Sequence, residues 1–586
     1  MKELRYINKF FKKYKWKLLI GVVITIIARV FSLVMPEYIQ YSVDAIEPYL
    51  LEGATDIESI KSILLKNIII IIASAALSAL FTFLMRQTII NVSRYIEFDM
   101  KNEVFDQYER LSLNFYKKNR TGDLMNRISE DVGKVRMYGG PALMYSIQTL
   151  TLFVCVIPLM FYTAPKLALY TLIPLPILSI LIYRISRIIH MRSTKVQEFL
   201  SELSTFTQET FSGISVIKAY GIEASVNGQW KQLANQGKQT SMALASVNSW
   251  FFPLMILLIG ISNLFVIYMG GIQYINGEIA TTGVILKFII YVNMLTWPVA
   301  TVGWVTSIVQ MAEASQKRIN EFLNEDPEIK SPQVPEKDIR GKIEFDNVSF
   351  TYDDTNITAL KNISFKIESG ETLAIIGKTG AGKSTILELI ARLYDVTSGE
   401  IRIDDQPIET FNLESLRKNI GAVPQDAFLF SDTIGNNIRF GKADASKEEI
   451  VGAAKQAAVH MNIAGFSKGY DTILGERGIT LSGGQKQRVS IARALIKDPK
   501  IYLFDDCLSA VDTETEEEIL GNLKEVADRT TTIIVSHRIS SAKNADKIIV
   551  LDEGHIIQQG SHNQLISQEG YYKELYLTQL SEKENS

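Results

Sequence analysis

Two short strings in this sequence are suited to binding phosphate groups. The first fits the pattern Gly-x-x-x-x-Gly-Lys-Ser, in which small residues let successive backbone N–H groups curve around a phosphate. A helix N-terminus at the end of such a loop adds a partial positive charge. We expect Lys383 to reach the β- and γ-phosphates of a nucleotide and Ser384 to ligate Mg²⁺. The loop consists of Gly377, Lys378, Thr379, Gly380, Ala381, Gly382, Lys383 and Ser384, and Thr385 follows it.

The second string is Leu481-Ser482-Gly483-Gly484-Gln485, well downstream of the first. Between the second string and the chain end, the carboxylates Asp505 and Asp506 follow the apolar run of residues 501–504. Ligands of α/β folds bind at the carboxyl ends of parallel strands, where such a pair would lie. Residues 371–376 form an apolar run before the first string, and residues 385–390 continue after it at helical spacing. The order strand, loop, helix supports a nucleotide site.

These strings together resemble those of the ATP-binding cassette (ABC) transporter family, and the resemblance covers essentially the whole chain. It implies ATP and Mg²⁺ as cofactors. It also implies that Tyr352 stacks on adenine, that Gln425 senses Mg²⁺, and that Asp505 holds the metal through water. The residues from Ser482 to Gln485 resemble the signature loop, which closes on the γ-phosphate bound by the opposite subunit.

The resemblance also assigns the catalytic roles. Asp506 takes the place of the catalytic carboxylate, and His537, in Val535-Ser536-His537-Arg538, that of the switch histidine. The residues from Ser509 to Asp512 resemble the D-loop. Taken singly, Tyr352 is equally consistent with an ordinary strand aromatic, and His537 with a polar surface residue. Their correct order along the chain favours the functional interpretation.

One residue departs from the family pattern. Most cassettes end the acidic strand with Asp-Glu, whereas this chain has Asp505-Asp506. Loss of one methylene withdraws the carboxylate by about 1.5 Å, and misplacements near 1 Å cost on the order of a hundredfold in rate. We therefore expect the site built on Lys383 to hydrolyse ATP slowly, while the signature loop serves the partner's site. This favours a heterodimer with a second half-transporter, and a homodimer with an aspartate base stays open.

The apolar residues are concentrated in the first half of this 586-residue chain, which is too long for one domain. Six stretches approach the length of a bilayer crossing. Runs such as residues 68–76 lack the polar face of a surface helix. Buried helices of a large soluble protein are the alternative, notably for the threonine-containing last stretch. The stretches are residues 18–35, 63–85, 141–162, 167–185, 251–270 and 284–309.

Charge predicts the orientation of these spans. The first 17 residues and the segment 110–127 are rich in lysine and arginine, whereas residues 44–58 are acidic. Basic segments stay in the cytoplasm. The sequence therefore predicts a multi-pass protein of the inner (cytoplasmic) membrane with a cytoplasmic ATP-binding domain. Residues 4–14 are expected to form an amphipathic helix in the cytoplasmic interface, with a solvated basic tail as the alternative.

Two polar excursions, residues 86–140 and 186–249, carry charged helical patterns and are expected to continue the membrane helices into the cytoplasm. Their strings at 115–124 and 213–221 resemble the intracellular loops of ABC half-exporters, which dock on ATPase domains. Three prolines mark a linker at 324–340. We therefore predict a multidomain fold: an all-α six-helix transmembrane domain over 1–323, this linker, and an α/β P-loop ATP-binding cassette over 341–586.

Other features narrow the possible functions. A net charge of −3 and the lack of a basic stripe away from the membrane give no case for nucleic-acid binding. Cys155 and Cys507 show neither a disulfide framework nor metal-ligand spacing, so no metal other than Mg²⁺ is expected. Arg29 and Glu37 are candidates for lining a wet inner cavity, because intramembrane charges seldom face lipid. The alternative is that Arg29 only pairs structurally with a neighbour.

The sequence thus predicts an ATP hydrolase that exports a small amphipathic or hydrophobic substrate from within a lipid membrane, as half of a dimeric ABC exporter. Drugs, lipids and hydrophobic peptides all stay open as substrates. The alternatives are an ATP-gated channel, a regulatory membrane ATPase without net pumping, and a homodimeric lipid flippase. A soluble-type cassette protein acting on nucleic acid is disfavoured by the apolar first half.

Overall fold

The computed structural model describes residues 2–52, 57–475, 481–508, 511, 513–527 and 530–584. The chain divides into two compact units, Met1–Glu109 with Gly122–Glu325, and Arg110–Thr121 with Asp326–Ser586. The polar excursion expected at 86–140 is therefore shared between the two units. The last helix of the first unit ends at Leu323 and the first strand of the second begins at Ile343.

The described part of the first unit is helical. Proline opens two of its helices, α9 at Pro165 and α10 at Pro174, where the missing N–H costs nothing. The helices are η1 (Glu3–Ile7), α1 (Asn8–Lys13), α2 (Lys15–Ser32), α3 (Val34–Glu52), α4 (Ile57–Arg110), α6 (Thr121–Asn126), η2 (Arg127–Asp131), α7 (Val132–Met137), η3 (Tyr138–Ala142), α8 (Leu143–Thr163), α9 (Pro165–Leu172), α10 (Pro174–Ser212), α11 (Ile214–Tyr220), α12 (Glu223–Ser249), α13 (Phe251–Ile275) and α14 (Gly283–Leu323).

Five helical stretches among the described residues are long and apolar enough to cross a bilayer. The fourth span expected from the sequence, residues 167–185, covers most of α9 and the first turns of α10, which are separated at Ile173, and its crossing of the membrane stays a prediction. The five stretches are Lys15–Pro48, Ile57–Arg110, Thr121–Thr163, Glu223–Ile275 and Gly283–Leu323.

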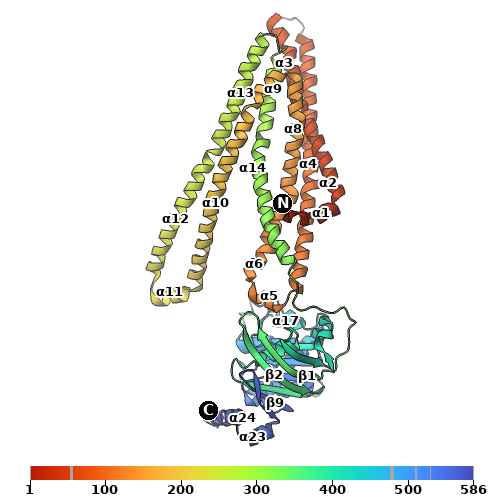
Figure 1. Ribbon diagram of the computed structural model, residues 1–586, viewed down its shortest axis with the longest axis vertical. Coiled ribbons are helices and arrows are strands. Elements are labelled where there is room, and N and C mark those ends of the chain that lie inside the picture. Colours follow the sequence, from red (N-terminus) through yellow and green to blue (C-terminus); the bar gives the residue numbers. More distant parts are fainter. Residues whose placement is uncertain are drawn as a thin grey trace. The chain divides into compact units, whose positions relative to one another are not determined.

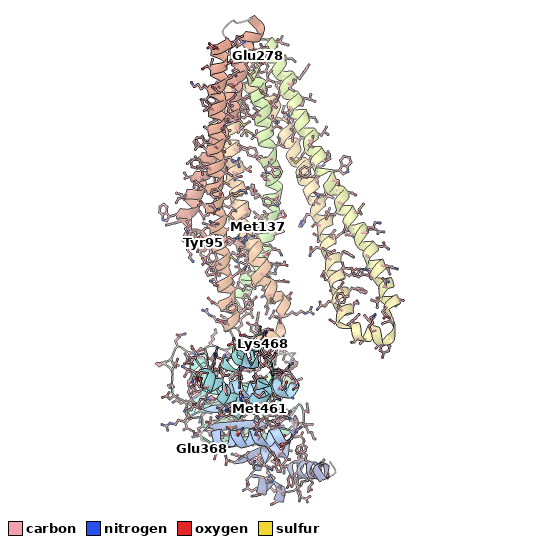
Figure 2. All side chains as sticks on the ribbon, turned by 180° about the vertical axis from the view of Figure 1, so that it is seen from behind. Tyr95, Met137, Glu278, Glu368, Met461 and Lys468 are labelled. Atoms are coloured by element: carbon pink, nitrogen blue, oxygen red, sulfur yellow. The ribbon has the colours of Figure 1, made fainter. Side chains whose placement is uncertain are left out.

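Helix α14 packs along α3, α7, α8 and α13, and its inward residues form the centre of an apolar core. Phe288, Tyr291 and Leu295 of α14 are fully buried there, against Val156 and Met160 of α8. Within the same unit, α10 and α12 form a long antiparallel hairpin that diverges from the other helices and ends in α11 (Figure 1). At the opposite end of the unit, Glu278 pairs with Lys166 (Figure 2).

The N-terminal segment packs on the first unit through alternating apolar and polar contacts. Leu4, Ile7 and Phe10 are buried. Lys9 and Tyr6 both reach Glu103 of α4, at 2.5 and 2.6 Å. The amphipathic pattern expected for residues 4–14 is present, and Phe10 on its apolar face is buried against protein.

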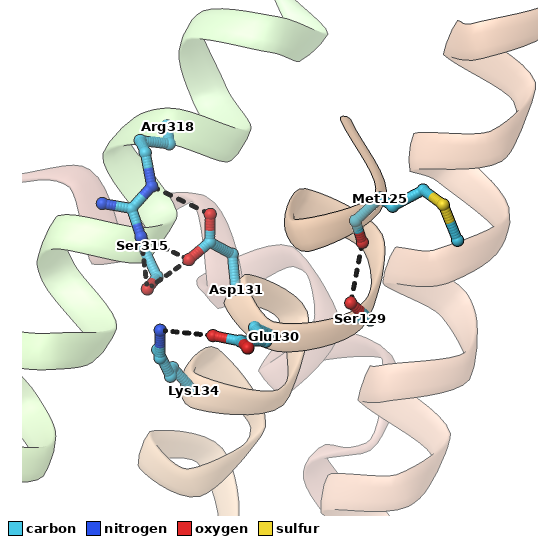
Figure 3. A network of polar contacts seen from close by, with 7 residues as sticks. All are labelled: Met125, Ser129, Glu130, Asp131, Lys134, Ser315 and Arg318. Atoms are coloured by element: carbon cyan, nitrogen blue, oxygen red, sulfur yellow. Dashed lines mark hydrogen bonds and ion pairs between the residues drawn. The ribbon is translucent and has the colours of Figure 1, made fainter. Parts of the chain in front are cut away.

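A buried carboxylate ties α14 to the π-helical turn η2. Asp131 accepts hydrogen bonds from Arg318 Nε at 2.9 Å, from Arg318 Nη2, and from Ser315 Oγ at 2.8 Å (Figure 3). This bidentate arrangement fixes both planar groups. One turn away, Lys134 pairs with Glu130 at 3.2 Å.

The second unit is an α/β domain built on two sheets. The larger sheet has the order β10-β9-β3-β8-β7-β6, parallel except for β10, and the smaller antiparallel sheet has the order β2-β1-β4-β5. The strands are β1 (Ile343–Tyr352), β2 (Ile357–Ile367), β3 (Thr372–Gly377), β4 (Ser398–Ile403), β5 (Gln406–Pro407), β6 (Ile420–Val423), β7 (Ile501–Asp505), β8 (Thr531–Val535), β9 (Lys547–Asp552) and β10 (His555–Gly560).

The larger sheet is buried on both faces. In β3, Leu373 and Ile375 join the core shared with the smaller sheet, whereas Ala374 and Ile376 join a second core that contains Tyr572. This follows from the two-residue side-chain period of a strand. The helices of the unit are α5 (Leu113–Lys118), α15 (Lys383–Ile390), η4 (Ile408–Thr410), α16 (Leu413–Lys418), α17 (Ile434–Arg439), α18 (Lys447–Gln456), α19 (His460–Ala464), η5 (Gly469–Asp471), α20 (Gly483–Leu495), α21 (Thr513–Ala527), α22 (Ile539–Ala542), α23 (His562–Ser567) and α24 (Tyr571–Glu584).

Candidate functional site

The backbone of the loop between β3 and α15 holds the side chain of a buried lysine. Lys383 Nζ donates hydrogen bonds to the carbonyl oxygens of Gly377 and Lys378, both at 2.8 Å. Burial lowers the pKa of Lys383, and the nearby carboxylates of Asp506 and Asp505 oppose that shift. The ammonium is therefore fixed in place by the loop itself.

Glycine is required at the end of this loop. Gly382 has φ +97°, and a Cβ there would lie 2.4 Å from the Ala359 carbonyl oxygen. Gly380, at φ +82°, faces open space instead. The loop can thus wrap its backbone N–H groups around a ligand without side chains in the way.

The two aspartates lie at the carboxyl end of β7. Asp505 Oδ1 accepts a hydrogen bond from Ser384 Oγ at 3.0 Å, and burial raises the pKa of Asp505. The Asp506 backbone N–H donates to the Val535 carbonyl oxygen at 2.9 Å. Asp506 itself has φ +41°, an uncommon conformation for a residue other than glycine. The backbone therefore fixes the position from which the Asp506 side chain extends.

Tyr352, at the end of β1, is held at its hydroxyl group. Its Oη lies 2.8 Å from Glu388 Oε2 and 3.0 Å from Thr385 Oγ1, and burial raises its pKa. Its ring meets Tyr394 edge-to-face at 5.5 Å between centroids. Lys117 Nζ lies 4.8 Å from the centre of the Tyr352 ring.

One pocket of about 500 Å³ brings most of the expected site residues together. The residues Ser482 to Gln485 do not line it. Ser482 caps α20 instead, since its Oγ accepts from Gln485 N–H at 3.3 Å and Gln485 Oε1 accepts from Ser482 N–H at 3.0 Å. The expected residues that do line the pocket are Tyr352, Thr379, Gly380, Gly382, Lys383, Ser384, Thr385, Gln425, Asp505, Asp506 and His537.

Three expected positions, Ser509, Ala510 and Asp512 of the D-loop string, lie outside the described residues. Among the residues that are described, no group of three or more His, Cys, Asp or Glu side chains could hold a metal by itself. The hydroxyl of Ser384, the amide oxygen of Gln425 and the carboxylate of Asp505 are hard oxygen donors around one pocket. Such donors suit Mg²⁺ that also binds substrate phosphates, so the chain's residues fit a magnesium nucleotide.

Three contacts around the pocket were not predicted from sequence. Lys117, in the string 115–124 expected to dock on an ATPase domain, covers the Tyr352 ring, a partner that the string did not specify. Gln487 Nε2 donates to the Gln425 carbonyl oxygen. Gln579 of α24 donates to the His537 carbonyl oxygen at 2.9 Å and accepts from the Ile539 N–H at 2.8 Å. Each joins segments far apart in the chain, and no local pattern indicates it.

The sequence of this chain matches two protein families. Residues 18–299 match the ABC transporter transmembrane region, and residues 360–509 match the ABC transporter family. The multidrug resistance-like ATP-binding protein MdlA of Escherichia coli (strain K12) is 34% identical over 579 residues, which cover 98% of this chain and 96% of MdlA. The chain belongs to the ABC transporter family.

Other ABC proteins agree over nearly the same length. The ATP-dependent lipid A-core flippase of Syntrophus aciditrophicus (strain SB) is 36% identical over 493 residues, covering 84% of this chain and 82% of the flippase. The solved structure of a bacterial Atm1-family ABC exporter with ATP bound has a TM-score of 0.80 at 28% identity, covering 96% of this chain and 98% of that one.

The family membership gives the chain its general activity. It is an exporter-type ABC half-transporter, a multi-pass membrane protein with a helical membrane domain fused to an α/β nucleotide-binding domain. It binds nucleotide and couples ATP hydrolysis to transport. Half-transporters of this type function as dimers.

Proposed function

We propose that this chain exports an amphipathic or hydrophobic molecule across the cytoplasmic membrane, as one half of a heterodimer whose ATP site on this chain is slow. The observation that carries the proposal is the composition of the pocket. It contains Lys383, Gln425, Asp506 and His537, whereas the signature residues of α20 lie elsewhere. A second subunit would have to supply its own signature loop to close this pocket.

In the proposed site, each side chain acts on a different part of the nucleotide. Tyr352 stacks on adenine, the backbone from Gly377 to Ser384 wraps the phosphates, and Lys383 neutralises the terminal ones. Mg²⁺, held by Ser384, Gln425 and water-linked Asp505, would supply positive charge between the phosphates.

Two further side chains act on the attacking water and the terminal phosphate. Asp506 would orient the water, and His537 would donate to the γ-phosphate.

The slow rate follows from the length of the Asp506 side chain. Its backbone is anchored between β7 and β8 through the hydrogen bond to Val535. A residue anchored there cannot advance to recover the roughly 1.5 Å lost with one methylene. The signature residues retain their full helix-capping geometry, so the partner's site keeps what it needs from this chain.

A dimer is also supported by the hairpin of α10 and α12. At its tip, α11 has no buried residue, and the large apolar side chains of Val216 and Tyr220 are 56% and 77% exposed. Apolar groups gathered at the end of a long hairpin fit a partner surface. ATP bound between two subunits would favour the closed state by its differential affinity, and hydrolysis would release it.

The test compares the chain purified alone with the chain purified together with a second half-transporter, taken from the neighbouring reading frame where one is encoded there. We expect weak ATPase activity alone and a strong increase on pairing. Inverted membrane vesicles then report whether a hydrophobic dye accumulates against its gradient when ATP is added. Dye movement that only follows its gradient would contradict export and favour the channel alternative. Vigorous ATPase activity of the chain alone would contradict the slow site.

A further inference from the structure

Arg29 of α2 is a cation in a membrane helix that forms no ion pair with a carboxylate among the described residues. Arg29 lies inside the apolar stretch Lys15–Pro48, about 21 Å from its first residue and about 28 Å from its last at 1.5 Å per residue. Its guanidinium donates from Nη2 to Gln148 Oε1 of α8 at 2.8 Å, a neutral amide. Guanidinium has five N–H donors and is always charged. A full positive charge therefore remains in the membrane domain.

A buried cation in the same helices, Lys287, shows how such a charge is usually balanced. Lys287 of α14 forms an ion pair with Glu37 at 2.6 Å, and Tyr291 Oη donates to the same carboxylate at 3.2 Å. That charge is balanced inside the protein. Because charges at bilayer depth are costly unless paired or functional, the contrast indicates that Arg29 is kept for a partner from outside the chain.

Arg29 lines a cavity of about 270 Å³ between α2, α8 and α14. Thr149 and Thr301 meet on its wall, with their hydroxyl oxygens 3.3 Å apart. Trp297 also lines it and is 60% exposed, so its indole presents a large apolar face. One cation, two hydroxyls and an aromatic ring thus converge on one small space.

We propose that this cavity is a subsite for the anionic head of an amphipathic substrate, a sulfonate, carboxylate or phosphate ester joined to an apolar body. Arg29 binds the acid group through its forked N–H donors. The Thr149 hydroxyl donates to a remaining oxygen, because the Thr301 hydroxyl already donates to the Pro298 carbonyl oxygen at 2.8 Å. Trp297 packs on the body next to the acid group. The cavity is smaller than a whole drug-sized pocket, so it holds the head and leaves the tail outside. The assignment rests on the export function proposed above.

The test uses the purified dimer in phosphatidylcholine nanodiscs and two dyes with the same aromatic body. 1-Anilinonaphthalene-8-sulfonate carries the acid group, and N-phenyl-1-naphthylamine does not. The measured quantity is the dye concentration at half-maximal change of ATPase activity. We expect the sulfonate to act at lower concentration than the neutral dye. Equal concentrations for the two dyes would overturn the subsite.

Two variants remove the net charge in opposite ways. Arg29→Gln deletes the cation. Gln148→Glu keeps Arg29 and places a carboxylate of the same shape against it, so it tests the role of the charge even if Arg29→Gln folds poorly. Each should raise the half-maximal concentration of the sulfonate by about ten- to a hundredfold, the contribution of a charged hydrogen bond. The neutral dye should shift little. Arg86→Gln removes a cation from α4 outside this cavity and serves as the control; an equal shift in that variant would overturn the subsite.

Two further measurements distinguish a lipid head from a soluble anion, and the subsite from the export function. If the natural anion is a lipid head, nanodiscs with phosphatidylglycerol raise ATPase activity in an Arg29-dependent manner and leave no further response to the sulfonate; if it is a soluble molecule, the sulfonate response persists. In vesicles, one outcome is that the dye fails to move against its gradient while the ATPase response still prefers the sulfonate in an Arg29-dependent manner. That result would contradict the export function and leave the subsite standing. Equal uphill movement of the sulfonate and the neutral dye would contradict the subsite and leave the export function standing.

Discussion

Two cations, the buried Lys383 in the nucleotide pocket and the half-buried Arg29 in the membrane domain, are held in different ways. Lys383 donates to two backbone carbonyl groups and lies near two carboxylates, all from residues that the loop and two strand ends bring together. Arg29 donates to one amide in a cavity of about half the volume. The first site is organised by its own chain, whereas the second leaves its counter-charge to a ligand.

The difference reflects what each site must do. ATP is the same molecule in every turnover, so a fixed arrangement of donors costs no reorganisation during the reaction. A cavity that receives varied amphipathic molecules gains from one strong charge and few other directional groups. Variants of the nucleotide pocket can break or support this contrast.

Lys383→Ala should reduce the ATPase rate of the chain's own site by at least about a hundredfold, because it removes a positioned cation from the terminal phosphates. The measurement is steady-state phosphate release by the purified dimer, in which a competent partner site would leave a residual rate. Lys378→Ala is the matched control. Its ammonium points to Asp552, 3.9 Å away, so the loss should be much smaller. Equal losses would show that Lys383 is not special in this loop.

Asp506→Glu should raise the ATPase rate of the chain alone by up to about a hundredfold, since the longer side chain returns the carboxylate to the attacking water. Asp506→Asn, which keeps the length and removes the charge, should lower it further. Single-turnover measurements on the chain without its partner check both. No gain with glutamate, together with vigorous wild-type activity, would contradict the slow site and the heterodimer argued from it.

Tyr352→Ala should weaken nucleotide binding by about 1–3 kcal/mol through lost stacking on adenine. Tyr352→Trp should be tolerated. Tyr352→Phe is the sharper control, because it removes only the hydroxyl that lies against Glu388 and Thr385. Calorimetric titration with a non-hydrolysable ATP analogue gives the affinities. If phenylalanine is as damaging as alanine, Tyr352 acts through those hydrogen bonds and not through stacking.

Gln579→Leu should lower kcat by about three- to tenfold with little change in KM, because two hydrogen bonds that hold the His537 loop are lost. Thr578→Ala changes the adjacent residue of α24, whose hydroxyl bonds only within its own helix at Glu574, and should leave kcat near the wild-type value. A fall in thermal stability without a fall in kcat would assign Gln579 to folding rather than to positioning.

Local patterns explain what was predictable from the sequence. Gly377 ends β3 and Lys383 begins α15 because strand, loop and helix are specified by neighbouring residues. The carboxylates at the end of β7 follow from a short apolar run in the same way. The roles of these residues in catalysis stay predictions.

Contacts between distant segments were not predictable. The string around Lys117 indicates docking on an ATPase domain but does not specify Tyr352 as the partner, and nothing near Gln579 indicates a contact with His537. The helix pattern of residues 4–14 is the same whether its aromatic face meets lipid or protein, so the burial of Phe10 could not be read from it. The helix break inside the span expected at 167–185 follows from Pro174, which lacks the N–H that a continuous helix uses.

The length of α4 has a mechanical consequence. It contains 54 residues from Ile57 to Arg110, about 80 Å at 1.5 Å per residue, whereas the hydrocarbon core of a bilayer is only ~30 Å thick. A rod of this length works as a lever. A tilt of about 10° at one end moves the other by roughly 14 Å, so a rotation small enough to preserve side-chain packing within the membrane becomes a displacement of molecular size at the far end.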